Sequence, residues 1–169
     1  MPTRKHILTG RKPSLRRMGG TRKMIRSINK GKKSGLATMI VPTFLNMLNT
    51  VKLYHWKTTS YSTHKATDDL YSKMGELTDK FVEVMLGKEE LGGRSKLLNG
   101  GASARAYVLN LSLYSSNTDF KKQIEQYKTF LINVSNDPVF NSGVNVDLLA
   151  IRDELLAELN QFLYLLSLH

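Results

Sequence analysis

The sequence of 169 residues has no cysteine and no run of eighteen apolar residues. The lack of cysteine excludes disulfides, thiol catalysis and thiolate metal sites, and it fits a reducing compartment. The lack of a long apolar run predicts that no segment spans a membrane. No apolar core of about 7–15 residues follows the N-terminal charges, as a secretory signal would require. These absences favour an intracellular protein, and the length is enough for one domain.

Acidic side chains are missing from residues 1–33, which hold 12 of the 25 Lys and Arg residues. The rest of the chain has 13 basic residues against all 14 acidic ones, so the net charge of +11 belongs to the N-terminal segment. Residues 1–37 also contain five glycines and no sustained helical or alternating period. We call residues 1–37 the arm and predict that it is flexible when alone, because it cannot bury enough apolar surface.

The arm is predicted to bind a polyanion, and nucleic acid is the polyanion that its charge favours. Such binding would be independent of sequence and strongly dependent on salt, because it releases counterions from phosphates. The alternatives are a solvated tail that only raises solubility, or contacts with neighbouring proteins. The candidate nucleic-acid-binding residues are Arg4, Lys5, Arg11, Lys12, Arg16, Arg17, Arg22, Lys23, Arg26, Lys30, Lys32 and Lys33.

Four amphipathic helical periods follow the arm without any strand pattern. They predict helices at about residues 37–58, 62–86 and 117–134, and a fourth helix that begins at residue 145 or 147. We therefore predict an all-α protein whose second domain, residues 38–169, is an antiparallel four-helix bundle. About thirty residues separate the second and third helices. A link of this length can carry the chain back along the bundle, as the single crossover of ferritin-like folds does.

Residues 52–83 hold two of the four histidines and the first five acidic residues. On a wheel of about 100° per residue, Asp68, Asp79 and Glu83 lie within about 100° of His64, away from the apolar stripe of the same helix. The i,i+4 pairs His64 with Asp68 and Asp79 with Glu83 each place two side chains on successive turns. Imidazole with carboxylates suits Fe(II), and also Mn or Zn. The alternative is a solvated polar helix face.

Asp68 and Asp79 are eleven residues apart, which is about 16 Å along a helix, so one ion cannot bind both pairs. An antiparallel second copy, related by a two-fold axis near residues 73–75, would place the Asp79 pair of one chain opposite the His64 pair of the other. That arrangement makes two equivalent sites per dimer. Gly75 lies on the same helix face and would allow the two backbones to approach.

A Tyr-His-Trp sequence at residues 54–56, the His-x3-Asp and the Asp-x3-Glu together resemble the Dps proteins (DNA-binding proteins from starved cells), the mini-ferritins. That family has a His-Trp at the end of its first helix, and its Asp-x3-Glu follows eleven residues after the Asp of its His-x3-Asp. The resemblance covers about residues 38–168. The loop between the two histidines is three residues shorter than is usual in the family. The metal ligands that the resemblance implies are His55, His64, Asp68, Asp79 and Glu83.

The resemblance implies a ferroxidase that binds Fe(II) between two-fold-related subunits, oxidises it with peroxide or oxygen and assembles into a homo-oligomer such as a dodecamer. No residue beyond the ligands is implied to be catalytic, and Trp56 would lie beside the site. His55 also lies on the apolar stripe of the first helix, where a lone histidine is more often a hydrogen-bonded core residue. The implied location is the cytoplasm or nucleoid.

Two alternatives remain from the sequence. In one, the metal site is vestigial and the bundle only presents the arm to nucleic acid. In the other, the protein is a non-catalytic structural component of a large assembly, a capsid or virion. The arm is longer than in most Dps proteins, and its composition is similar to the basic tails of structural proteins from large DNA viruses.

Overall fold

The computed structural model of the protein describes residues 35–91, 93, 113–114 and 116–168. Within these residues the chain forms four long α-helices and a short 3-10 helix, and no strand. The all-α prediction is therefore confirmed for this part of the chain. The elements are α2 (Gly35–Lys57), α3 (Tyr61–Leu86), η1 (Glu89–Leu91), α5 (Asn117–Asn136) and α6 (Val146–Leu165).

The predicted helix boundaries agree with the observed ones to within two residues. Serine side chains cap two of the helices, as their short polar side chains favour. Ser60 Oγ accepts a hydrogen bond from the Thr63 amide at the start of α3, and Ser116 Oγ accepts one from the Asp119 amide at the start of α5. One boundary differs from the prediction: residues 35–37, assigned to the arm, belong to the first turn of α2.

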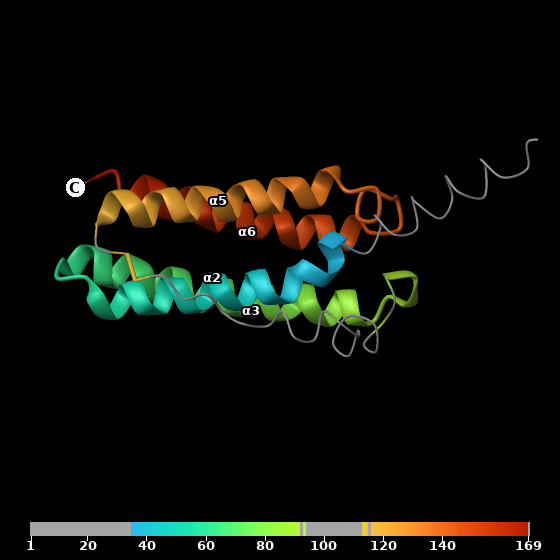
Figure 1. Cartoon of the computed structure of the whole chain (residues 1–169), viewed down its shortest axis with the longest axis horizontal. Coiled ribbons are helices and arrows are strands. Elements are labelled where there is room, and N and C mark those ends of the chain that lie inside the picture. The colour runs from blue at the N-terminus through green and yellow to red at the C-terminus, as the bar shows by residue number, and fades with distance from the viewer. Residues whose placement is uncertain (1–34, 92, 94–112, 115, 169) are drawn as a thin grey trace, which may run out of the picture. The chain divides into compact units, whose positions relative to one another are not determined.

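The four long helices bury one common core. α3 packs against both α2 and α6, and α5 packs against α6 and α2. Figure 1 shows α2 beside α3 and α5 beside α6. Aromatic side chains link the helices: Phe44 of α2 meets Phe81 of α3 edge to face at 5.3 Å, and Phe120 of α5 meets Phe162 of α6 at 5.9 Å. Such ring pairs stabilise a core beyond the area that they bury.

Helical spacing predicts an apolar stripe in each of the last two helices, and all members of both stripes are buried. They are Phe120, Ile124, Tyr127 and Leu131 in the third helix, and Leu148, Leu155, Leu159, Phe162 and Leu166 in the fourth. In α2 the core face is rotated slightly from the predicted stripe, because α2 packs against both α3 and α5. Its fully buried apolar residues are Ile40, Met47 and Val51. Val41 and Leu48 are only partly buried, although the spacing predicts that they share one apolar stripe with Phe44, Val51 and His55.

Among the described residues, the helix α2 has the length and the apolar composition that a membrane-crossing helix needs, with a mean hydropathy of 1.2. Its buried residues contact the other helices. That packing explains part of the apolar character, since a helix in a protein core is also rich in apolar residues.

Most of the predicted crossover between the second and third helices lies outside the described residues, and so do residues 1–34 of the arm.

Candidate metal centre at the α2–α3 turn

The turn between α2 and α3 brings the two predicted histidine ligands together. Only residues 58–60 separate the two helices, so the end of α2 lies against the start of α3. His55 is in the last turn of α2 and His64 is in the first turn of α3. Their rings are stacked, with 3.8 Å between centroids and 25° between planes.

Each histidine is held by a hydrogen bond to the main chain of the other. His55 Nδ1 lies 3.0 Å from the carbonyl oxygen of His64, and His64 Nδ1 lies 3.0 Å from the carbonyl oxygen of His55. Because a carbonyl oxygen can only accept, this geometry assigns the proton to Nδ1 in both rings. A neutral ring in this tautomer carries its lone pair on Nε2. Metal-binding histidines are commonly oriented in this way, with the second ring nitrogen donating to a carbonyl or carboxylate.

The two histidines differ in burial. His55 is only 7% exposed, and its Nδ1 also lies 3.3 Å from Thr67 Oγ1. The Thr67 hydroxyl donates to the carbonyls of Thr63 and His64, which joins the first turns of α3 to this ring. His64 is exposed. His55 is therefore a buried, hydrogen-bonded histidine, as its position on the apolar stripe of the first helix predicts. In the assigned tautomer its Nε2 still carries a lone pair.

Asp68 adds a carboxylate to this corner. Its Oδ1 lies 3.8 Å from His55 Nε2 and 3.6 Å from Lys52 Nζ. Two ligand atoms that are each about 2.0–2.2 Å from one ion are at most about 4.4 Å apart. The His55–Asp68 distance is therefore compatible with a shared ion. The Lys52 ammonium group also lies over the rings of Tyr71 and Trp56, at 4.7 and 5.8 Å from their centroids.

Asp79 and Glu83 lie further along α3, and both are exposed. The buried residues of this helix, which include Leu70, Met74 and Phe81, form its other face. The prediction that the α3 face with the four candidate ligands does not serve the core is confirmed. An added Cβ at Gly75 would meet no atom of the chain within 4 Å, so the middle of this face is open.

The five predicted ligands are not gathered within one chain. Among the described residues, no group of three or more His, Asp and Glu side chains is close enough to hold a metal ion. His55, His64 and Asp68 lie at the α2–α3 turn, while the Asp79 and Glu83 pair lies toward the other end of α3. The twelve predicted nucleic-acid-binding residues, from Arg4 to Lys33, lie outside the described residues.

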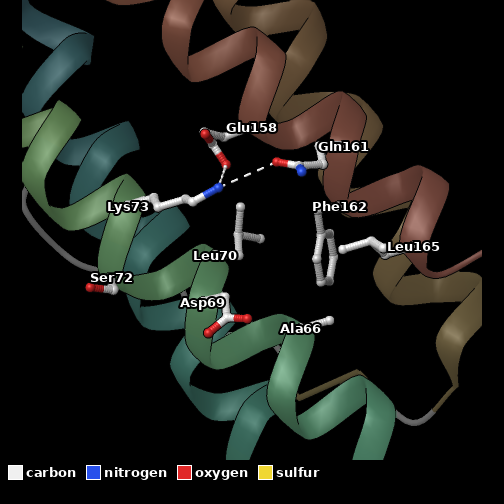
Figure 2. Close-up of a pocket in the computed structure, with 9 residues that line it drawn as sticks. All are labelled: Ala66, Asp69, Leu70, Ser72, Lys73, Glu158, Gln161, Phe162 and Leu165. Atoms are coloured by element: carbon white, nitrogen blue, oxygen red, sulfur yellow. Dashed lines mark hydrogen bonds and ion pairs between the residues drawn. The ribbon is translucent and has the colours of Figure 1, made fainter.

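A second feature, a groove of about 330 Å³ between α3 and α6, was not predicted. Figure 2 shows Lys73 of α3 reaching across it to Glu158 and Gln161 of α6, at 2.8 and 3.3 Å. Leu70 and Phe162 are among the residues that line it. The residues come from helices more than eighty positions apart in the sequence, so no local pattern could have revealed the groove. Its ion pair joins α3 to α6.

Comparison with known proteins gives one family. No curated protein and no solved structure matches the chain. The model of a family of unknown function, DUF5856, matches residues 55–166. The match begins at His55 and covers both histidines of the turn, Asp68 and the Asp79 and Glu83 pair. Since it includes well over half of the 169 residues, the chain belongs to the DUF5856 family.

Proposed function

We propose that this protein is a Dps-like mini-ferritin that binds Fe(II) between two copies of the chain and oxidises it with peroxide or oxygen. In this proposal the four helices form an antiparallel bundle of the ferritin-like type. The three-residue link between α2 and α3 supports it, because so short a link makes neighbouring helices run in opposite directions. The long link from Leu86 to Asn117 would be the crossover.

The observation that carries the proposal is the reciprocal hydrogen bonding of His55 and His64. Two imidazoles that each donate Nδ1–H to a carbonyl are preorganised to offer Nε2 to a metal ion. Asp68 supplies a carboxylate oxygen beside one of them. This nitrogen and oxygen donor set suits Fe(II), and carboxylate oxygen is a hard ligand that also suits the ferric product.

A second copy would complete the ligand set. Asp79 and Glu83 are exposed on the same helix as His64 and Asp68 but too far along it to reach the same ion. A two-fold axis near Gly75 would bring the Asp79 and Glu83 pair of one copy to the histidines of the other. The open space over Gly75 supports close approach there. Trp56 would lie beside the site, since Lys52 connects its ring to Asp68.

The proposal is tested by measuring oxygen uptake after Fe(II) is added to the full chain, together with the mass of the assembly in solution. We expect uptake faster than that of Fe(II) in buffer, saturation at a fixed iron-to-chain ratio, and an even-numbered assembly. A monomer that binds no Fe(II) under anaerobic conditions would overturn the proposal.

Gly75 provides a test of the two-fold axis. We expect Gly75→Arg to lower both the association of two chains and the rate of iron oxidation, because a long charged side chain would separate the two α3 helices. Folding of the single chain should be preserved, since an arginine favours a helix more than glycine does, by roughly 0.5–1 kcal/mol. Sedimentation and oxygen uptake give the two readouts.

The control is Ala157→Arg, which places the same side chain on an exposed position of α6. This variant should assemble and oxidise iron as the wild type does. If Gly75→Arg also keeps its association and its activity, the axis does not lie at this part of α3.

We further propose that the arm binds nucleic acid without sequence preference. Its support is the charge distribution: twelve basic and no acidic residues in positions 1–33, on a chain that is otherwise close to neutral.

A structural role in a large assembly, without catalysis, is the second candidate function. Exposed aromatic side chains at the α2–α3 turn favour it, because Trp56 is 68% and Tyr61 is 82% exposed. Large aromatic residues are common where proteins contact each other. Absence of iron-dependent oxygen uptake, together with a large assembly, would favour this function over the first.

A further inference from the structure

We propose that Lys52 acts as an internal counter-cation of the metal site. Its ammonium group pairs with Asp68 in the metal-free protein and must leave Asp68 before a metal ion binds. This inference rests on the proposed metal-binding function and adds to it a residue that controls affinity. Lys52 is not one of the predicted ligands, and its ammonium group cannot coordinate a metal while it is protonated.

The position of the Lys52 ammonium group carries the inference. Its Nζ lies 3.6 Å from Asp68 Oδ1, the same oxygen that lies 3.8 Å from His55 Nε2. A metal ion shared by Asp68 and His55 would therefore lie next to the ammonium group. The Lys52 side chain is only 27% exposed, so water screens this repulsion less than it would on an open surface. The lysine and the metal ion compete for the same carboxylate.

The aromatic rings give Lys52 a second favourable contact. Its Nζ lies 4.7 Å from the centroid of Tyr71 and 5.8 Å from that of Trp56, within the range of cation–π attraction. If a metal ion takes Asp68, the ammonium group can keep a ring contact while it leaves the carboxylate. The change in charge beside the indole ring should alter the fluorescence of Trp56. Because Trp56 is the single tryptophan of the chain, the signal reports this corner alone.

The test is a titration of the full chain with Zn(II), a redox-inert ion, followed by calorimetry and by Trp56 fluorescence. We expect Lys52→Met to bind Zn(II) about tenfold more tightly than the wild type, since one positive charge next to the ion is removed. The fluorescence change on Zn(II) binding should be much smaller in the variant, because no ammonium group moves. Anaerobic titration with Fe(II) should show the same order of affinities.

The matched control is Lys65→Met. Lys65 Nζ lies 3.2 Å from Asp69, a neighbour of Asp68 that is not a predicted ligand, so the variant removes the same charge from a different carboxylate of α3. It should change Zn(II) affinity by less than about twofold.

Three outcomes would overturn the inference. Equal Zn(II) affinity in the wild type and in Lys52→Met would do so and would leave the metal site intact. An equal gain in Lys52→Met and Lys65→Met would show only the effect of net charge. If neither the wild type nor the variants bind Zn(II) or Fe(II), the proposed metal-binding function fails together with the inference.

Discussion

Replacing Asp68 with alanine is expected to abolish iron oxidation and leave the fold almost unchanged. The carboxylate is the one predicted oxygen ligand that contacts the histidine pair, at 3.8 Å from His55 Nε2. Loss of a group that only orients a ligand already costs about 10–100-fold in metal affinity or activity, so loss of a ligand should cost about 100-fold or more. Oxygen uptake at saturating Fe(II) and anaerobic Fe(II) binding measure the two effects.

Stability should change little, because the Asp68 side chain is 51% exposed and its contacts are long. An exposed ion pair contributes up to about 1 kcal/mol, and alanine favours a helix more than aspartate does, which offsets part of the loss. Thermal unfolding of the metal-free protein is the measurement. A Tm lowered by more than about 8 °C would mean that Asp68 has a structural role.

Asp69→Ala is the matched control for Asp68→Ala. Asp69 is the next residue of α3, is also exposed, and forms an ion pair with Lys65 rather than with the histidine corner. The control should retain iron oxidation and the same thermal stability within error. If Asp68→Ala oxidises iron as fast as Asp69→Ala does, the α2–α3 turn is not the iron site.

Deleting residues 1–33 is expected to remove nucleic-acid binding and to preserve the helical domain. The deletion ends before α2 begins at Gly35, so no described helical residue is lost. It removes all twelve clustered basic residues and leaves a chain of net charge close to zero. A protein that neutralises about 6–10 phosphates loses about 10³–10⁵ in affinity between roughly 50 and 200 mM salt. Binding that depends on such contacts should disappear with the arm.

Retention of a duplex and of a single strand at several salt concentrations measures this effect. A full-length variant with the twelve basic residues changed to glutamine separates charge from chain length, and it should lose binding as the deletion does. Circular dichroism and the mass of the assembly should remain those of the wild type. Equal DNA retention by the deleted and full chains at moderate salt would show that the arm is not the binding element.

Much of the fold could be predicted from local sequence because helix periodicity is a local property. The stripe of Phe120, Ile124, Tyr127 and Leu131 repeats every three or four residues, and all four side chains are buried. Ser60 caps the start of α3, and serine is a local sequence signal for a helix start because its side chain can bond the amides that a helix leaves unpaired. The stripe predicted for α2 was less accurate, since two neighbouring helices, α3 and α5, together determine which of its residues are buried.

The sequence by itself determined the all-helical class, the helix boundaries, the charged arm and the exposed face of α3 that carries His64, Asp68, Asp79 and Glu83. These depend on composition and on spacing along one helix. Only the tertiary structure decided that His55 and His64 exchange hydrogen bonds, that Lys52 lies against Asp68, and that Lys73 reaches α6. Such contacts depend on the packing angle between helices and on side-chain rotamers, and neither is encoded in the spacing of residues along a single helix.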